Sequence, residues 1–324
     1  MTQVTQKRYL VTGGAGFIGS HVTEHMLGLG HAVTVLDNFA TGKRENLDQV
    51  RVAVGAEAAS RLRVVEGCIT NADDVARACE GVHGSGHLAA LRAVGRSVET
   101  PVESHHYNGP GTVQVLDAAR QRGLKVVYAG SSSAYGDQDT DFKHEGLRED
   151  PLSPYASSKL ASELYCRSFA RVYGTPIVVT RFFNVFGPRQ VPDSPYSGVV
   201  AAFCFALLQG RAPRIDGDGS QSRDFTYVQD VARGVTMALE AETAGCQTVN
   251  LACAGNHTVK SLFEILRSQA GVDVEPVYAA PRTGDVKHSR AAIDRIRDLV
   301  GFEPEVSFAD GLARTYDWYR ATYS

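Results

Sequence analysis

Eleven consecutive residues predict a β-strand, a tight turn and the start of a helix, and they read Leu10-Val11-Thr12-Gly13-Gly14-Ala15-Gly16-Phe17-Ile18-Gly19-Ser20. Gly13 permits the turn where the strand ends, Gly16 lets the backbone approach a ligand, and Gly19 lets the helix pack against the strand. The N–H groups and the dipole at the start of the helix favour an anion such as a pyrophosphate. The spacing GxxGxxG alone would also suit an ordinary turn, so the neighbouring sequence has to decide.

A second apolar segment, residues 32–36, supplies that context because it ends in Asp37. In a dinucleotide-binding unit, an acidic side chain at the end of the second strand accepts hydrogen bonds from the adenosine ribose hydroxyls and repels a 2′-phosphate. The polar loop 38–46 would then cover the adenosine. We therefore predict a site for NAD rather than NADP.

The composition limits the classes of protein to which the chain can belong. Its 324 residues carry a formal net charge of −3, so no basic field attracts nucleic acid. No apolar run approaches the roughly 20 residues of a membrane span, and residues 1–8 lack the apolar core of a signal peptide. The six cysteines form no CxxC pair and the ten histidines form no HExxH motif. We expect a cytoplasmic protein with reduced thiols, no metal site, and no nucleic-acid or membrane partner.

Strand-like and helix-like segments alternate through the first half of the chain, as in βαβ units with a parallel sheet. The fold class that we predict is α/β: a Rossmann-type doubly wound parallel sheet in residues 1–180, and a smaller α/β substrate-binding lobe mainly in residues 181–324, from which some segments return to the sheet. The expected strands cover residues 8–12, 32–36, 61–65, 82–89, 125–129 and 177–181. The fourth is weak because Gly84 and Gly86 interrupt it. Helices are expected at residues 20–29, 101–122, 199–208 and 230–240.

Three polar residues form a candidate catalytic group. Tyr155 and Lys159 are four residues apart and share one face of a helix, whose core face Leu160 and Leu164 would provide. A tyrosine has a pKa of about 10, but a nearby ammonium and an oxidised nicotinamide both favour its phenolate, so it can act as a base. Ser131, after the fifth strand, can hydrogen-bond the same substrate hydroxyl. Tyr-xxx-Lys occurs by chance in many helices; the glycine turn and the serine cluster before it favour the catalytic interpretation.

These motifs are similar to those of the extended short-chain dehydrogenases/reductases. The resemblance begins with the glycine turn, the segment 131–136 and Tyr155-xxx-Lys159. Later motifs resemble those of nucleotide-sugar enzymes, and of UDP-sugar 4-epimerases above all: Arg181-Phe182-Phe183-Asn184-Val185-Phe186-Gly187-Pro188-Arg189-Gln190, Gly217-Asp218-Gly219-x-x-x-Arg223-Asp224-Phe225-x-Tyr227-Val228 and Arg282-Thr283-Gly284-Asp285. The resemblance covers nearly the whole chain.

The resemblance implies two sets of binding residues in addition to the catalytic Ser131, Tyr155 and Lys159. NAD would be held by Tyr155 and Lys159 together with Gly13, Gly16, Phe17, Ile18, Gly19, Asp37, Asn38, Cys68, Ile69, Leu88, Ala89, Ala90, Arg92 and Asn108. The UDP-sugar would be held by Tyr155 together with Ser132, Ser133, Asn184, Arg189, Val199, Ile215, Arg223, Arg282, Asp285 and Ser289. Guanidinium groups suit a diphosphate, although an ordinary surface ion pair is the simpler explanation for Arg189.

The residues beside Ser131 separate the reactions of this family. The resemblance implies that a 4,6-dehydratase would have an Asp-Glu pair, and a decarboxylase a glutamate at the second position, where this chain has Ser132 and Ser133. With no carboxylate there, the site has a base for the C4 hydroxyl, which suits 4-epimerisation through a transient 4-keto sugar. A dehydratase or decarboxylase is the alternative enzyme. A non-catalytic NAD-sensing protein is the alternative of another class, although such proteins commonly lack the Tyr/Lys pair.

The identity of the sugar depends on a few positions that the resemblance singles out. Ser289 stands where epimerases restricted to plain hexoses have a tyrosine, so a C2 N-acetyl group would fit, and residues 184–196 resemble the N-acetylhexosamine type. A hexuronate would fit if Arg189 met its carboxylate, but uronate epimerases often have threonine at the position of Asn184. The substrate is therefore predicted as a UDP-N-acetylhexosamine or a UDP-hexuronate or UDP-hexose.

Two further expectations come from the resemblance. Relatives usually have an aspartate that contacts adenine at the position of Cys68, so the cysteine removes that acceptor. Relatives also dimerise through two helices of each subunit. We therefore expect a homodimer with apolar positions of helices 101–122 and 155–173 at its interface.

Overall fold

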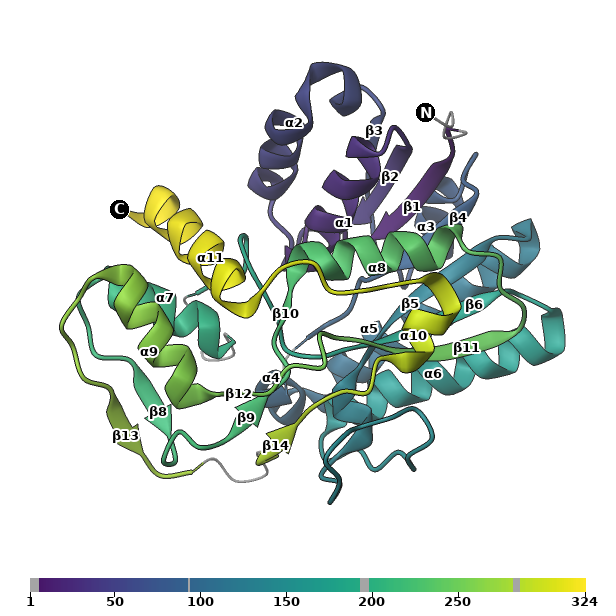
Figure 1. The fold of residues 1–324 in the computed structure, drawn as a ribbon. Coiled ribbons are helices and arrows are strands. Elements are labelled where there is room, and N and C mark those ends of the chain that lie inside the picture. Colours follow the sequence, from purple (N-terminus) through teal and green to yellow (C-terminus); the bar gives the residue numbers. More distant parts are fainter. Residues whose placement is uncertain (1–5, 93, 193–197, 282–285) are drawn as a thin grey trace.

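The computed structural model describes residues 6–92, 94–192, 198–281 and 286–324, which form a large lobe built on a sheet and a smaller lobe beside it (Figure 1). The sheet strands are β1 (Arg8–Thr12), β2 (Ala32–Asp37), β3 (Leu62–Glu66), β4 (Gly84–His87), β5 (Lys125–Ser131), β6 (Ile177–Phe182) and β11 (Cys246–Leu251). They are all parallel and lie in the order β11-β6-β5-β4-β1-β2-β3. The strand order reverses between β1 and β4, where such sheets bind ligands. The predicted fold class is confirmed.

Two apolar layers cover the two faces of this sheet. One layer contains α1 (Phe17–Gly28), α2 (Arg44–Ala59), α8 (Val228–Glu240) and α10 (Asp294–Val300). The other contains α3 (Ala72–Ala78), α5 (Pro101–Arg122) and α6 (Pro154–Tyr173), with the short α4 (Val94–Glu99) packed on α5 and α6. Figure 1 shows α8 and α6 on opposite sides of the sheet. Residues that directly follow β1, β2, β3 and β4 line one cavity.

Helix α6 carries the candidate catalytic pair, and local sequence sets its ends. Ser153 is the N-cap and accepts a hydrogen bond from the N–H of Ala156 at 3.2 Å, and Gly174, with φ 69°, ends the helix in the left-handed region. The predicted core face of this helix is wrong, because Leu164 is exposed and Leu160 is half-buried. The helix instead buries a more polar face that includes Lys159 and packs against β5 and β6.

The smaller lobe is assembled from separate segments. Its helices α7 (Val199–Leu208), α9 (Val259–Ala270) and α11 (Phe308–Tyr323) enclose a third apolar core. Short strands pair β8 (Arg214–Asp216) with β13 (Val277–Ala279), β9 (Ser222–Arg223) with both β12 (His257–Thr258) and β14 (His288–Ser289), and β7 (Val185–Phe186) with β10 (Thr226–Tyr227). Between these pieces the chain returns to the large lobe, first for α8 and β11 and later for α10.

Strand β4 is shorter than the predicted 82–89, and its glycines explain how it is nevertheless buried. A Cβ on Gly84 would lie 3.4 Å from the side chain of Leu239, and a Cβ on Gly86 would lie 3.8 Å from Leu239 and from Val235. Helix α8 therefore covers the side of the strand that has no side chains of its own. Helix α2 begins at Arg44, so the predicted loop 38–46 ends earlier than expected.

Candidate active site

The turn between β1 and α1 forms a close-packed site for an anion. Gly13 has φ +70°, and a Cβ there would lie 2.8 Å from the backbone of Ala89. A Cβ on Gly19 would lie 2.1 Å from the carbonyl oxygen of Gly13, so α1 can begin this close to the strand only with a glycine. Gly16 is the N-cap of α1, and within the described residues no side chain caps it. The amide N–H groups at this end of α1 suit a phosphate group.

Asp37 ends β2 at the edge of a cavity next to this turn. Its carboxylate accepts hydrogen bonds from the N–H groups of Ala15 and Phe39, each at 2.9 Å. Burial raises the pKa of Asp37, and these two hydrogen bonds act against the rise. Gly42 lets the next loop close over the carboxylate, since a Cβ there would lie 2.9 Å from both carboxylate oxygens. The carboxylate is thus fixed where it can accept hydrogen bonds from ribose hydroxyls.

The cavity extends from the glycine turn to α6. It is lined by nearly all the residues predicted to hold NAD, namely Gly13, Gly16, Phe17, Ile18, Gly19, Asp37, Asn38, Cys68, Ile69, Leu88, Ala89, Ala90, Arg92, Tyr155 and Lys159. It is also lined by Thr41, Gly42, Lys43 and Asn46, from the segment 38–46 that was expected to cover the adenosine. Arg96 and Tyr107 line it too, and the sequence analysis did not indicate them. The glycine turn, the carboxylate of Asp37 and the Tyr155/Lys159 pair are together suited to binding NAD.

Asn108 is the residue of that predicted set that does not line the cavity. Its side chain is buried and accepts a hydrogen bond from the N–H of Leu91 at 2.8 Å. It donates to the carbonyl oxygen of Leu91 at 3.1 Å and to the hydroxyl of Ser158 at 2.9 Å. Asn108 therefore joins the loop after β4, which lines the cavity, to the helix that carries Lys159.

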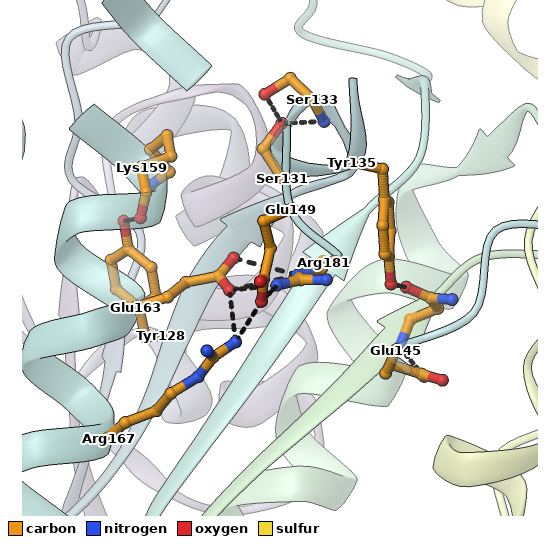
Figure 2. Close-up of polar contacts among 11 residues, drawn as sticks. Tyr128, Ser131, Ser133, Tyr135, Glu145, Glu149, Lys159, Glu163, Arg167 and Arg181 are labelled. Carbon is orange, nitrogen blue, oxygen red and sulfur yellow. Dashed lines mark hydrogen bonds and ion pairs between the residues drawn. The ribbon is translucent and has the colours of Figure 1, made fainter. Parts of the chain in front are cut away.

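The three predicted catalytic residues come together at the α6 end of the cavity. Lys159 is 3% exposed, and its Nζ lies 4.4 Å from the centre of the Tyr128 ring (Figure 2). Burial lowers the pKa of Lys159 to about 8. Burial raises the pKa of Tyr155, whereas a hydrogen bond with Ser131 and the positive charge of Arg92 lower it. Cations beside the phenol favour its phenolate, so the arrangement suits a general base.

The serine run after β5 forms one turn of 3₁₀ helix, Ser132–Tyr135. Ser131 caps this turn: its Oγ accepts a hydrogen bond from the N–H of Ser133 at 3.2 Å and lies 2.8 Å from the Ser133 Oγ (Figure 2). Ser131, Ser132 and Ser133 are all half-buried. The turn thus presents hydroxyl groups where dehydratase-like or decarboxylase-like chemistry would need carboxylates.

His87, at the end of β4, is a residue of this region that sequence reasoning did not assign. Its Nδ1 lies 2.7 Å from the hydroxyl of Thr12 and its Nε2 lies 3.0 Å from the hydroxyl of Thr112. Burial lowers the pKa of His87 to about 3, and the charge of Lys159 acts in the same direction. A neutral imidazole here adds no positive charge that would oppose the ammonium of Lys159.

Two of the predicted substrate residues are neighbours in the smaller lobe. Arg223 of β9 and Ser289 of β14 are partners in a parallel strand pair. The Nη1 atom of Arg223 donates to the carbonyl oxygens of Ser222 at 2.9 Å and Lys287 at 3.0 Å. Ser289 is 7% exposed. The strand pair therefore fixes the positions of a guanidinium group and a small side chain relative to each other.

The other predicted substrate residues are placed less uniformly. Asn184 is exposed and donates a hydrogen bond to the carbonyl oxygen of Asp224 at 2.9 Å. Val199 is half-buried, whereas Ile215 is fully buried in the core of the smaller lobe, so only its backbone could meet a ligand. Arg282 and Asp285 lie outside the described residues.

Arg189 joins the two lobes. Its Nη2 forms an ion pair with Glu24 on α1, and its Nε donates to Gln49 on α2 at 3.3 Å. The residue is 8% exposed and has a left-handed backbone with φ +66°. It also lines the cavity of the predicted NAD residues. Arg189 is therefore engaged in an ion pair, as the simpler interpretation expects, but this pair is buried between the lobes rather than at the surface.

Cys68 faces the cavity beside Asn38. The Nδ2 of Asn38 donates to its sulfur at 3.8 Å, and the hydroxyl of Thr70 lies 3.1 Å from the same atom. A thiol is only a weak hydrogen-bond acceptor. The position thus offers an adenine much less than the usual aspartate would.

Two negative findings concern the described residues only. Among them, no group of three histidine, cysteine, aspartate or glutamate side chains is arranged to hold a metal ion. None of the described helices combines the length and the apolar character needed to cross a membrane. All six cysteines are free thiols.

The chain is similar to known proteins over most of its length. Residues 9–252 match the model of the NAD dependent epimerase/dehydratase family. A UDP-glucose 4-epimerase of Mycolicibacterium smegmatis is 36% identical over 316 residues, which cover 97% of this chain and 98% of that protein. A UDP-glucuronate 4-epimerase of Thermodesulfobacterium geofontis is 35% identical and covers 96% of this chain and 95% of its own length.

The fold of this chain is also similar to solved structures. A UDP-N-acetylglucosamine 4-epimerase from Methanobrevibacter ruminantium, in complex with UDP-N-acetylmuramic acid, has a TM-score of 0.92 at 34% identity and covers 98% of this chain and 100% of its own. A UDP-glucuronic acid 4-epimerase from Bacillus cereus, with UDP-glucuronic acid and NAD, has a TM-score of 0.88 at 30% identity with the same coverage. This chain is a member of the NAD dependent epimerase/dehydratase family.

Proposed function

We propose that this protein is an NAD-dependent UDP-sugar 4-epimerase, an isomerase that inverts C4 of a UDP-hexose derivative through a transient 4-keto sugar. The observation that carries the proposal is the hydroxyl-only turn of Ser131, Ser132 and Ser133 next to Tyr155 and Lys159. Such a site can remove and return the O4 proton, but Ser132 and Ser133 place no carboxylate beside Ser131 to move a second proton. Several relatives with similar sequences are UDP-sugar 4-epimerases by name, which supports the same reaction.

Each catalytic residue has a defined task in this reaction. Tyr155, as phenolate, takes the proton from O4, and Ser131 hydrogen-bonds the same oxygen. Lys159 supplies the positive charge that favours the phenolate. NAD, when bound, supplies the acceptor for the C4 hydride and returns that hydride later. Because the hydride comes back to the opposite face of the 4-keto sugar, the hexose must turn while the nucleotide stays bound.

The UDP moiety is assigned to the smaller lobe. Arg223 is held next to Ser289 by the β9–β14 pair, and guanidinium groups bind diphosphates well. Asn184, Arg282 and Asp285 are assigned to the same task on the resemblance of their motifs. Two rigidly placed lobes would then hold the two ends of the substrate, the sugar lying between Tyr155 and Ser289.

For the sugar, we favour a UDP-N-acetylhexosamine. The small, buried Ser289 would leave room for an N-acetyl group. Arg189, which would have to meet a uronate carboxylate, is engaged with Glu24 and Gln49 instead. A UDP-hexuronate or a plain UDP-hexose is the second choice.

One experiment tests reaction and substrate together. The purified protein is incubated in separate samples with UDP-N-acetylglucosamine, UDP-glucuronate and UDP-glucose, and the products are read by proton NMR. A product inverted at C4 supports the proposal and identifies the sugar. An unsaturated, deoxy or pentose product would select the dehydratase or decarboxylase alternative, and NAD retained without turnover of any sugar would select the non-catalytic one.

We also propose a homodimer in the cytoplasm. Several large apolar side chains of α4, α5 and α6 are exposed in the single chain: Val98, Val102, Leu164, Tyr165, Val172 and Tyr173. An exposed apolar surface of this kind is typical of a protein–protein interface. The free thiols support a reducing compartment.

A further inference from the structure

Glu163 continues the line of functional residues along α6. It follows Lys159 by four residues, as Lys159 follows Tyr155, so the three side chains share one helix face. The side chain of Glu163 is fully buried, where an unpaired carboxylate would be costly. It is paired with Arg181 of β6, also fully buried, through contacts of 2.7 and 3.1 Å to one carboxylate oxygen and 3.3 Å to the other (Figure 2).

Two more side chains complete what we call the Arg181 cluster, which consists of Glu149, Glu163, Arg167 and Arg181. Glu149, from the segment that leads into α6, accepts from Arg181 at 2.9 Å and from Arg167 at 2.6 Å. Arg167 lies 3.8 Å from Glu163 and is partly exposed at the rim. Two carboxylates thus balance two guanidinium groups, and Arg181 is fixed from both sides (Figure 2).

The cluster lies directly beneath the strand end that carries Ser131. Gly130, which precedes Ser131 and lines the cavity, is the strand partner of Arg181. A Cβ on Gly130 would lie 2.9 Å from a carboxylate oxygen of Glu163. Only a glycine lets the strand come so close to this carboxylate. The carboxylate of Glu163 therefore lies between the helix that carries Tyr155 and Lys159 and the strand that carries Ser131.

We propose that Glu163, held in place by Arg181, is a positioning residue for the epimerase reaction: it fixes the helix of Tyr155 and Lys159 against the strand of Ser131 and places a negative charge one helical turn from the Lys159 ammonium. The inference rests on the proposed function for its catalytic meaning. The geometry on which it stands, a buried carboxylate between the two elements that carry the catalytic group, is independent of the substrate.

The surroundings of Lys159 show why this charge matters. The titratable groups that face it are His87 from β4, Tyr128 from β5, and Cys166 and Glu163 from α6. Arg92 and Tyr155 line the same cavity. Burial lowers the pKa of Lys159 to about 8, and Glu163 is the main influence in the opposite direction. His87 is neutral, so the carboxylate of Glu163 is the anion that supports the ammonium.

The variant Glu163→Gln removes this charge and keeps the shape. Because Lys159 then loses its proton at a lower pH, the alkaline limb of the kcat/KM profile should move to lower pH by about half a unit or more. We expect kcat to fall about tenfold or more, while KM for the UDP-sugar stays within about twofold, since Glu163 contacts no predicted substrate residue. An unchanged profile in a folded Glu163→Gln protein would overturn the proposal.

A second readout needs no turnover. The ε-CH₂ signal of Lys159, in protein labelled with ¹³C-lysine and assigned by its absence from a Lys159→Met variant, is titrated by NMR in the holoprotein. Loss of the negative charge at Glu163 makes the Lys159 ammonium less favourable, so the Lys159 titration should move to lower pH in Glu163→Gln. If wild type fails to epimerise any sugar but this displacement is found, the proposed function fails and the positioning role stands; no displacement refutes the role itself.

Two control variants separate charge from stability. Arg167→Gln changes the partly exposed rim of the Arg181 cluster and leaves Glu163 with Arg181, so both titrations should stay as in wild type. The double variant Glu163→Gln/Arg181→Gln leaves no unpaired buried charge and should fold even if the single variant does not. Its Lys159 titration should be displaced to lower pH by less than in the single variant, because the Arg181 cation is lost as well. A Lys159 titration that stays as in wild type in both variants would show that the carboxylate has no electrostatic role.

Discussion

The phenol of Tyr155 lines the cavity beside Lys159 and can, as a phenolate, accept a proton from a sugar hydroxyl. Tyr155→Phe should therefore lower kcat by about 10²–10⁴-fold, the usual contribution of a general base. UDP affinity, measured by calorimetry, should stay within about twofold, because the nucleotide is assigned to the smaller lobe. Tyr165→Phe, an exposed tyrosine on the same helix, is the matched control and should be fully active. Equal activity of the two variants would remove Tyr155 from the mechanism.

The carboxylate of Asp37 should decide how well the protein retains NAD. In Asp37→Asn the amide can no longer accept hydrogen bonds with a full negative charge, and the repulsion of a 2′-phosphate is lost. We expect the purified variant to contain less NAD and to discriminate less between NAD and NADP. The measurement is the dinucleotide content of an acid extract, with the exposed Asp48→Asn on α2 as control. Undiminished NAD in Asp37→Asn would contradict the assignment.

At the scale of single residues, the sequence predicts those residues that can be identified from their near neighbours in the chain. The glycine turn, Asp37 and the Tyr/Lys pair are defined by spacing along the chain, and the structure places them around one cavity. His87 and Glu163 could not be found in this way. Their importance comes from partners on other strands, such as Thr12, Thr112 and Arg181, which are far away in sequence.

At the scale of elements, Asn250 of β11 holds three segments together. Its Oδ1 accepts from the hydroxyl of Tyr135 at 2.6 Å, and its Nδ2 donates to the carbonyl oxygens of Lys143 at 2.8 Å and Ala292 at 3.0 Å. It thereby links the serine turn, the loop before α6 and the segment that follows β14. Asn250 therefore connects the turn that follows Ser131 with the segment that follows Ser289.

Asn250→Ala should destabilise the protein by about 2–4 kcal/mol, because it leaves a buried hydroxyl and buried carbonyl oxygens without partners. The measurement is urea unfolding followed by circular dichroism. Gln247→Ala, at an exposed position of the same strand, should change stability by less than about 0.5 kcal/mol. Similar effects of the two substitutions would show that the Asn250 hydrogen bonds contribute little.

Helices and strands could be predicted where the local sequence pattern agrees with which side chains the folded chain buries. The helix 101–122 was predicted with the bounds of α5, because a proline near its start and Gly123 after its end mark them. The core face of α6 was predicted wrongly, because apolar side chains were expected to be buried. In the folded chain the buried face carries Lys159 and Glu163, and Leu164 points to solvent. The buried face carries the candidate catalytic lysine, and the exposed Leu164 lies on the face proposed to form the dimer interface.

At the scale of the whole molecule, the exposed apolar face of α6 predicts the oligomeric state. Leu164→Glu should convert a dimer into a monomer, because a carboxylate at the centre of an apolar interface would be desolvated without a partner. Size-exclusion chromatography with light scattering measures the mass. Val52→Glu, an exposed valine on α2 in the opposite layer, should leave the dimer intact. A wild-type protein that is already monomeric, or a Leu164→Glu dimer, would rule out this interface.

The division between the lobes is the part of the architecture that the sequence described least well. Some segments after residue 181 were expected to return to the sheet, but the sequence did not indicate which ones; in the structure α8, β11 and α10 belong to the large lobe. Strand β11 was not predicted at all. Its partner β6 lies more than sixty residues earlier, and such distant pairing leaves no periodic signal in the intervening chain.

Helix α8 and strand β11 come late in the sequence, and this matters for any attempt to produce the predicted NAD-binding domain, residues 1–180, alone. A fragment that stops at residue 180 would expose β6 as a bare sheet edge, with Ile177, Val178 and Val179 ready to pair with another molecule. It would also uncover the glycine strand β4, which has no apolar side chains with which to form a surface of its own. Such a truncation would aggregate rather than yield a minimal dinucleotide-binding module.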